Sequence, residues 1–297
     1  MDIRILLEQF CDYSLSIKGY SHDTIRRYRY VISCTCRFMS IETIDQVTPD
    51  KIRALFYYGR TTRHWSVNTY ITYHKTLLVF FRWCGKQGVL AVNPILDIEV
   101  PKLEKKLPPK LTKQTTLRLL EVVYNYPYNS QFLRYRNHAI FSTFVFAGIR
   151  KQELLNLKYT DVDIENLTIF IRQGKGRKDR IIPMSYSLAQ VLKKYITERS
   201  KLRRTNPEFF SSLHGNMGFT DNGLKKLVDQ IRKSSNIFFT VHKLRHTFAT
   251  LMLEGGCDIY SLYRMMGHSD IKTTTIYLAA SAEHLRSQMT KHPLNTL

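Results

Sequence analysis

The chain has 297 residues, more than a single hydrophobic core usually reaches, so two domains are expected. Hydrophobic residues make up 43% of the chain and charged residues 23%, which excludes a disordered protein, and no apolar run reaches the roughly 18 residues that span a bilayer. The formal net charge of +21 indicates a polyanionic partner, of which nucleic acid is the commonest.

Residues 1–100 predict a small bundle of four helices. Apolar side chains recur at intervals of three and four residues in these segments. Thr48 and Pro49 mark one helix start, because a hydroxyl side chain caps free N–H groups and proline suits the first helical turn. Short connections between such helices favour a bundle. The expected helices cover residues 3–17, 22–39, a segment that begins at 49, and 66–84.

Basic and aromatic residues of this bundle are candidates for DNA contact. Arg26, Arg27 and Arg29 lie on the second expected helix, and Tyr70 and Tyr73 lie on the fourth. Arginine binds phosphate, and aromatic rings can meet bases. The alternative is that these residues form a solvated face, and the sequence does not decide between the two.

Residues 101–112 predict an exposed linker between the two domains. Three prolines in this stretch prevent a helix, because proline lacks a backbone N–H and fixes φ. The charge also changes here: residues 1–100 carry 13 basic and 9 acidic side chains, whereas residues 101–297 carry 32 and 15. Lys105 and Lys106 either follow a phosphate backbone or belong to a solvated hinge. The expected division is therefore 1–100, 101–112 and 113–297.

Residues 113–297 predict a mainly helical domain with a small sheet. Two strand-like runs, 167–172 and 180–183, flank a glycine-containing turn and predict a β-hairpin. The density of cations at its tip favours an anionic partner. These cations are Lys175, Arg177, Lys178 and Arg180. The expected helices cover residues 113–124, 134–148, 187–199, 220–234, 242–255 and 258–267.

Three short clusters in this domain carry candidate chemistry, and the first contains Arg150. This arginine follows Gly148 at the junction of two expected helices, where its guanidinium can offer two parallel donors to a phosphate. Glu153, three residues later, can brace it. Taken alone, such a pair is more often an exposed salt bridge within one helix.

The second cluster places His242, Arg245 and His246 on one helix face, at spacings of three and four residues. A zinc site is one interpretation of His-x-x-x-His. However, Lys243 occupies the position of the glutamate in the HExxH motif, and the local positive charge favours an anion over a divalent cation. We therefore interpret His246 as a structural, hydrogen-bonded residue and Lys243 as a candidate DNA contact.

The third cluster contains His268 and Tyr277. Gly267 is expected to end a helix, which leaves His268 in a turn. Thr273 is expected to cap a short helix that presents Tyr277. One tyrosine among 18 would ordinarily be assigned to packing. Its position after two arginines, a hairpin lysine and two histidines favours a functional role.

In this order, the clusters resemble the catalytic domain of tyrosine site-specific recombinases, the family of phage integrases and Xer-type enzymes. The matching motifs are Gly148-Ile-Arg150-x-x-Glu153-Leu154, Gly174-Lys175-Gly176, His242-x-Leu244-Arg245-His246, and Gly267-His268 followed nine residues later by Tyr277. Met266 departs from the usual leucine before Gly-His. The first hundred residues resemble the SAM-like core-binding bundle of such enzymes. The resemblance implies a four-helix core-binding bundle followed by a mixed α/β catalytic domain.

The resemblance implies an enzyme that cleaves and rejoins DNA through a 3′-phosphotyrosyl intermediate and a Holliday junction, with no metal, cofactor or ATP. Tyr277 would be the nucleophile. Arg150 and Arg245 would neutralise the charge that builds on the phosphate oxygens, which is usually the largest contribution to such catalysis.

The remaining site residues also follow from the resemblance. Lys175 matches the general acid that protonates the leaving 5′ oxygen. His242 matches a residue that binds the phosphate and assists the proton of the nucleophile, and His268 matches a phosphate hydrogen-bond donor. Glu153 and His246 would hold these catalytic residues in place without touching the phosphate. Which histidine moves which proton stays open.

The expected partners are double-stranded DNA with inverted-repeat sites and three further recombinase protomers. Exchange of two duplexes needs four cleavages, and each protomer supplies one tyrosine, so a tetramer on DNA is expected, with or without a related recombinase. Leu285 and Met289, in a short amphipathic segment over 283–289, are candidates for coupling neighbouring protomers. No membrane is expected.

The expected location is the cytoplasm of a bacterium or archaeon, at the nucleoid. Five irregularly spaced cysteines without a CxxC pair indicate reduced thiols, and the first ten residues are unlike a signal peptide. The bundle begins close to Met1, so no arm-binding domain is expected before it, which disfavours a lambda-type integrase. Xer-type resolution, integration or excision of a mobile element, and inversion all remain open.

Two other functions would account for part of this pattern. A type IB topoisomerase shares this chemistry and would relax DNA without exchanging partners. A non-catalytic DNA-binding regulator would account for the charge and the helices, but not for the complete set of arginines, lysine, histidines and tyrosine.

Overall fold

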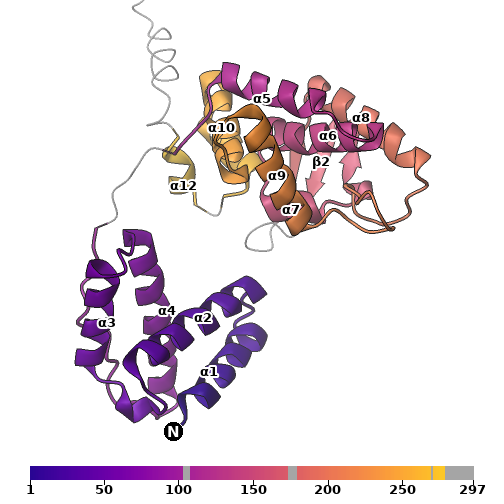
Figure 1. Cartoon of the computed structure of the whole chain (residues 1–297). Coiled ribbons are helices and arrows are strands. Elements are labelled where there is room, and N and C mark those ends of the chain that lie inside the picture. The colour runs from indigo at the N-terminus through magenta and orange to yellow at the C-terminus, as the bar shows by residue number, and fades with distance from the viewer. Residues whose placement is uncertain (103–107, 173–178, 269, 278–297) are drawn as a thin grey trace, which may run out of the picture. The chain divides into compact units, whose positions relative to one another are not determined.

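The computed structural model describes residues 1–102, 108–172, 179–268 and 270–277 (Figure 1). Contacts between Cα atoms divide the chain into two compact units, Met1–Lys105 and Lys106–Leu297, which we call the first and the second unit. Both are mainly helical and the second contains a small sheet, which confirms the expected fold class. Within the described residues, no helix is both long enough and apolar enough to cross a membrane.

The first unit is built from four long α-helices, as the apolar spacing predicts. The hydroxyl groups of Ser21, Thr48 and Ser66 accept hydrogen bonds from the first turns of three of them. The first helix is shorter than expected, because the residues after Asp12 form one π-helical turn. The elements are α1 (Ile3–Asp12), the π-helical turn Tyr13–Ile17, α2 (His22–Met39), α3 (Pro49–Thr61) and α4 (Val67–Lys86).

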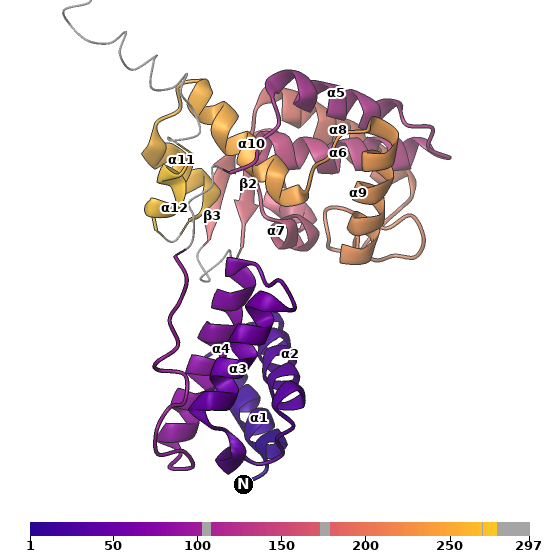
Figure 2. The same cartoon turned by 60° about the vertical axis from the view of Figure 1, so that its left-hand side comes forward.

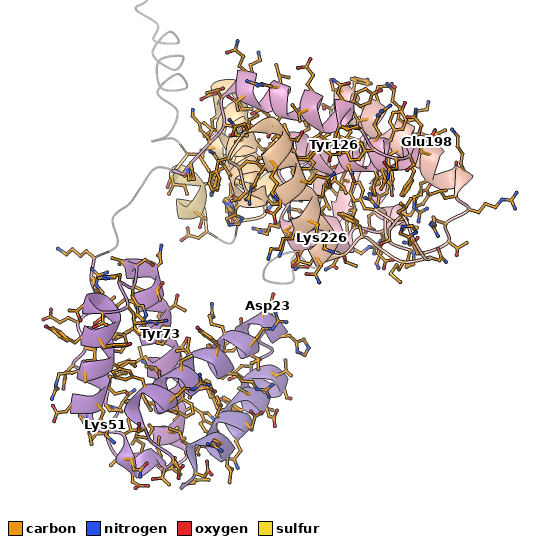
Figure 3. The ribbon with its side chains drawn as sticks, viewed as in Figure 1. Asp23, Lys51, Tyr73, Tyr126, Glu198 and Lys226 are labelled. Atoms are coloured by element: carbon orange, nitrogen blue, oxygen red, sulfur yellow. The ribbon has the colours of Figure 1, made fainter. Side chains whose placement is uncertain are left out.

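Two tyrosines of α4 contradict the expectation that they face outward. Tyr70 and Tyr73 are both more than nine-tenths buried in the core of the first unit. The Tyr70 hydroxyl donates a hydrogen bond to the carbonyl oxygen of Glu99 at 2.8 Å. The ring of Tyr73, labelled in Figure 3, packs against Trp65 with the ring centroids 4.1 Å apart. These rings stabilise the bundle and are not available for stacking on bases.

The arginines of α2 do lie on the surface. Arg26 forms an ion pair with Asp23 at 3.3 Å, and Arg29 forms one with Glu8 at 2.5 Å. Arg27 is exposed as well. Exposed ion pairs of this kind contribute little to stability, so these side chains can exchange their partners for phosphate at small cost. Their contact with DNA stays a prediction.

The second unit wraps its helices around α6, and a three-stranded antiparallel sheet lies at one side. The helices are α5 (Lys113–Asn125), α6 (Gln131–Ala147), α7 (Lys151–Asn156), α8 (Tyr186–Lys201), α9 (Asp221–Ser235), α10 (Val241–Glu254), α11 (Ile259–Met266) and α12 (Lys272–Thr275). The strands are β1 (Val162–Asp163), β2 (Thr168–Ile171) and β3 (Arg180–Pro183), in the order β1-β2-β3. The sequence predicts β2 and β3 but misses β1, which has only two residues and therefore no readable alternation.

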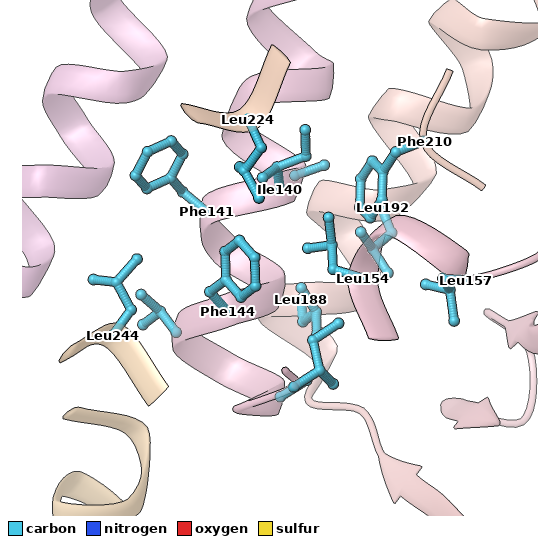
Figure 4. Close-up of a cluster of buried hydrophobic side chains, with 14 of the residues drawn as sticks. Ile140, Phe141, Phe144, Leu154, Leu157, Leu188, Leu192, Phe210, Leu224 and Leu244 are labelled. Atoms are coloured by element: carbon cyan, nitrogen blue, oxygen red, sulfur yellow. The ribbon is translucent and has the colours of Figure 1, made fainter. Parts of the chain in front are cut away.

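The core of the second unit forms around the apolar side chains of α6. Ile140, Phe141 and Phe144 are almost fully buried among leucines from α7, α8, α9 and α10 (Figure 4). Burial of this kind contributes about 1.5–3 kcal/mol for each large apolar side chain. The core thereby fixes the starts of α7 and α10. Arg150 is the residue immediately before α7, and Arg245 lies in the first turns of α10.

The last residues of the expected linker lie against the second unit. Leu111 is buried, and its backbone N–H donates to the Thr247 hydroxyl of α10 at 2.9 Å. The ammonium group of Lys110 lies 2.5 Å from the carboxylate of Glu254. Thr112 caps α5. Lys105 and Lys106 lie outside the described residues.

Candidate active site

Two arginines share the carboxylate of Glu153. Arg150 immediately precedes α7, and its Nη1 and backbone N–H donate to the two oxygens of Glu153, each at 2.7 Å. Arg180 of β3 donates from Nη1 and Nη2 to the same two oxygens, at 2.8 and 2.7 Å. Burial alone would raise the pKa of Glu153, but the hydrogen bonds and charges of Arg180 and Arg150 lower it to about 2. Glu153 is therefore ionised at neutral pH.

Carbonyl oxygens of two turns hold Arg150 and Arg245. Arg245 of α10 is 4% exposed, and it donates to the carbonyl oxygens of Gly148 and, at 2.6 Å, Met266. Arg150 donates from Nη2 to the carbonyl oxygen of Gly267 at 2.6 Å. Burial and the neighbouring charge of Arg150 lower the pKa of Arg245 to about 9, so it keeps its charge at neutral pH. The site concentrates positive charge where an anion can compensate it.

The two turns require glycine. Gly148 ends α6 with φ 58°, and Gly267 ends α11 with φ 59°, as the sequence predicts for Gly267. A Cβ on Gly148 would lie 2.1 Å from the ring of Phe248, and a Cβ on Gly267 would lie 2.8 Å from the guanidinium of Arg180. The carbonyl oxygens that hold the arginines are thus placed by a backbone conformation that other residues rarely adopt.

Gly148→Ala is expected to lower the free energy of unfolding by about 2–4 kcal/mol, because left-handed strain and a clash with Phe248 add together. Gly256→Ala is the matched control: its φ is 89°, but no atom lies within 4 Å of the added Cβ. Strain alone predicts a loss of about 1–2 kcal/mol there. Denaturant titration of both variants measures the difference, and equal losses contradict this account of the turn.

Tyr277 is buried beside the cationic site. Its side chain is 2% exposed and packs in a small cluster with Phe248 and Leu262. The hydroxyl lies 2.7 Å from Nδ1 of His246, and the ring lies nearly parallel to that of His268, with the centroids 6.4 Å apart. Burial raises the pKa of Tyr277, while the charges of Arg245 and Arg150 oppose that rise.

The three histidines surround the tyrosine differently. His242 is exposed one turn before His246, with the two ring centroids 5.5 Å apart. His268 contacts the Thr274 hydroxyl through Nδ1 at 2.7 Å. Burial and nearby positive charges lower the pKa of His246 to about 4 and that of His268 to about 3. Both are therefore neutral at pH 7. The supporting, hydrogen-bonded role of His246 stays a prediction, and the Tyr277 hydroxyl is the group that its Nδ1 contacts.

Lowering the pH is expected to destabilise the second unit, because the fold holds His246 and His268 neutral. The unfolded pKa of both is near 6.5, whereas the folded values are about 4 and about 3. Between these values the unfolded chain binds more protons, so the free energy of unfolding decreases as the pH falls below about 6.5. Melting temperatures between pH 7 and pH 4 measure this decrease. His246→Gln should make it shallower, and an unchanged slope contradicts the assignment.

Arg180 corrects one sequence interpretation. We expected it to contact DNA at the hairpin, but its side chain is only 9% exposed and is bound to Glu153. Its Nε also donates to the carbonyl oxygen of Met265 at 2.8 Å. Strand β3 packs against α11 (Figure 2). The bond to Met265, the next-to-last residue of α11, shows that the Arg180 side chain reaches this helix. Alternation along β3 was the only sequence signal for this, and four residues are too few to make it decisive.

The other predicted DNA contacts have different outcomes. Lys243 donates to the carbonyl oxygen of Phe238 at 3.0 Å and is partly buried. The catalytic candidate Lys175, with Arg177 and Lys178, falls outside the described residues, and so does the expected coupling segment 283–289. Over the part of the chain that the structure describes, no three His, Cys, Asp or Glu side chains come close enough to hold a metal ion.

Comparison with known proteins identifies the family of this chain. The phage integrase family matches residues 109–284, and the N-terminal SAM-like domain of phage integrases matches residues 6–89. Tyrosine recombinase XerD of Staphylococcus haemolyticus is 32% identical, over 97% of this chain and 98% of its own length. Tyrosine recombinase XerC of Oceanobacillus iheyensis is 30% identical, over 98% and 97%.

Solved structures give the same fold. The crystal structure of XerA recombinase is 28% identical and covers 98% of both chains, with a TM-score of 0.55. XerH recombinase bound to a palindromic difH substrate is 24% identical, with a TM-score of 0.74 over 96% of this chain and 83% of that one. The matched family covers more than half of the sequence, and it includes every described residue of the site. The chain therefore belongs to the phage integrase family and is a tyrosine recombinase that carries out site-specific DNA recombination.

Proposed function

We propose that Tyr277 is the nucleophile and that Arg150 and Arg245 bind the scissile phosphate. The observation that carries this proposal is the contact between the Tyr277 hydroxyl and Nδ1 of neutral His246, at 2.7 Å. This contact lies beside two arginines that are held by carbonyl oxygens of a turn. A phosphodiester has one negative charge, and more charge develops on its free oxygens during attack. Two guanidinium groups can stabilise that charge without a metal ion.

The proposed reaction is a balanced exchange of esters. The Tyr277 oxygen forms a bond to phosphorus while the bond from phosphorus to the 5′ oxygen breaks, which leaves a 3′-phosphotyrosyl link. The tyrosyl proton passes to a histidine beside the hydroxyl as the bond forms. Lys175, as the resemblance implies, gives a proton to the 5′ oxygen. The phosphate ester is conserved, so the reverse reaction rejoins a strand without ATP.

In this proposal each histidine assists the reaction through the group that it contacts. Neutral His246 accepts a hydrogen bond from the Tyr277 hydroxyl and fixes its direction. His242, exposed on the same helix face, is placed to meet the phosphate, and His268 would donate to a free phosphate oxygen. Glu153 orients Arg150 through two hydrogen bonds. The charge of Arg150 and Arg245 is available to the DNA because Glu153 is one carboxylate among three arginines.

The proposed substrate is double-stranded DNA with inverted-repeat sites, on which four protomers assemble and exchange strands through a Holliday junction. Lambda integrase has been solved as a tetramer bound to such a junction, at 17% identity to this chain. Arg26, Arg27 and Arg29, with the lysines of the linker, would follow the phosphate backbone. The proposed setting is the nucleoid of a bacterium, in Xer-type resolution or in integration and excision of a mobile element.

The experiment that tests this function uses a supercoiled plasmid with two directly repeated candidate sites. Recombination predicts two smaller circles with exchanged flanks, visible by restriction mapping. Relaxed plasmid without deletion would instead indicate a topoisomerase. Retarded but chemically unchanged plasmid would indicate a DNA-binding regulator. Footprinting on inverted repeats identifies the sites beforehand.

A further inference from the structure

One buried charge near the site has no role in the reaction described above. Arg180 is an arginine of β3 with 9% of its side chain exposed, and it uses both Nη atoms on the two oxygens of Glu153. Parallel donation of this kind is the strongest geometry between a guanidinium and a carboxylate. Burying such a pair has a large desolvation cost, so its presence calls for a physical explanation.

The contacts of Arg180 join three segments that are far apart in the sequence. Nε reaches the carbonyl oxygen of Met265 at the end of α11, and the Nη atoms reach Glu153 in α7. Gly267 is the residue that follows α11, and its carbonyl oxygen accepts a hydrogen bond from Arg150. A side chain on Gly267 would collide with the guanidinium of Arg180. Arg180 therefore contacts both groups that hold Arg150: the Glu153 carboxylate and the Gly267 turn.

The balance of charges around Glu153 explains this arrangement. Glu153 carries one negative charge, and Arg150 and Arg180 carry two positive charges. Without Arg180, the carboxylate would be neutralised by Arg150 alone, and that arginine would have less charge to offer to a phosphate. With Arg180 present, the three groups keep one net positive charge. Loss of Arg180 would also allow Glu153 and the Gly267 turn to shift. A displacement of 1 Å in a catalytic group can cost about 10²-fold in rate.

We propose that Arg180 is a positioning residue for strand cleavage: it neutralises and orients Glu153, so that Arg150 keeps its direction and its charge for the scissile phosphate. This rests on the role proposed for Arg150. Arg180 itself does not touch DNA in this assignment, which separates it from the hairpin cations with which the sequence groups it.

The first experiment measures the rate of covalent adduct formation on a nicked suicide substrate, with protein in saturating excess. Arg180→Met should lower this rate about 10–10²-fold and leave duplex affinity nearly unchanged. Arg180→Lys, which restores the charge but not the double donation, should recover part of the rate. Arg172→Met is the control for loss of an arginine–carboxylate pair elsewhere in the same unit: Arg172 pairs with Asp161 at 2.6 Å, with 59% of its side chain exposed. We expect less than a threefold change there.

The second experiment separates positioning of Arg150 from a general structural effect. A methylphosphonate at the cleavage position has no negative charge to neutralise, so loss of the Arg150 charge should matter little on it. The proposal predicts that the Arg180→Met defect falls to less than about threefold on this substrate, as the Arg150→Ala defect should. A defect of the same size on both substrates would mean that Arg180 acts only on the fold, and it overturns the proposal.

A third substrate tests the competing explanation that Arg180 acts through the hairpin and its Lys175. A bridging sulfur at the 5′ position leaves as a thiolate, which needs no proton from a general acid. Rescue of Arg180→Met by this substrate, and not by the methylphosphonate, also overturns the proposal. Should the wild-type protein form no adduct on any of these substrates, the proposed nucleophilic mechanism fails first. Arg180→Lys repeats the comparison should Arg180→Met fail to fold.

Discussion

Tyr277→Phe is expected to abolish the covalent protein–DNA adduct while folding and DNA binding survive. The change removes only a hydroxyl group, whose hydrogen bond to His246 contributes about 1 kcal/mol to stability. The aromatic ring stays in its apolar cluster beside Phe248. Without the oxygen there is no nucleophile, so the loss should be complete and not partial. Denaturing gels of a labelled suicide substrate measure the adduct, and gel retardation measures binding.

Tyr260→Phe is the control for this loss. Tyr260 lies on α11, close to the site in the sequence, but 59% of it is exposed. Removing the Tyr260 hydroxyl tests whether the loss of any tyrosine hydroxyl near the site abolishes the adduct. We expect this variant to form a wild-type amount of adduct. An adduct formed by Tyr277→Phe would show that another residue attacks the phosphate.

Arg245→Ala is expected to reduce the rate of adduct formation by about 10²–10³-fold or more, because it removes a preorganised cation from the developing phosphate charge. It also leaves the carbonyl oxygens of Gly148 and Met266 without their donor, so the melting temperature should fall. The rate is measured at saturating protein and well below the melting transition, which separates chemistry from unfolding.

Arg199→Ala provides the matched control for a buried arginine. Arg199 is 6% exposed in the same unit and donates to the carbonyl oxygens of Asn206 and Glu208. Its loss should reduce stability by a similar amount without a comparable loss of rate. If both variants lose rate in proportion to stability, the effect of Arg245→Ala is structural and the catalytic assignment is wrong.

The sequence predicts the helices well, because their ends are set by local chemistry. Thr48 and Ser66 cap helices as hydroxyl residues do, and Gly267 ends α11 in the left-handed conformation. The cap expected at Thr273 is wrong: α12 has no side-chain cap, and Ile271 occupies that position. A helix of four residues is held by its neighbours more than by its own termini.

What the sequence cannot provide is the partner of a side chain. Arg180 and Glu153 are 27 residues apart, and they meet only in the folded unit, where β3 packs against α11. His246 shows the same limit. The sequence places it on the same helix face as His242. Its contact with Tyr277 depends on the tertiary packing of Tyr277 beside α10. Helical spacing alone does not identify the side of α4 that meets Trp65, so it wrongly places Tyr73 at the surface.

The central claim is that Tyr277 attacks the DNA, and mapping the adduct of the unaltered protein tests it most directly. The protein is trapped on a suicide substrate and digested with trypsin and nuclease, and the modified peptide is identified by mass spectrometry. We predict a single modified residue, Tyr277, linked to a 3′-phosphoryl nucleotide. A nucleotide on any other residue, or a 5′ linkage, would contradict the mechanism.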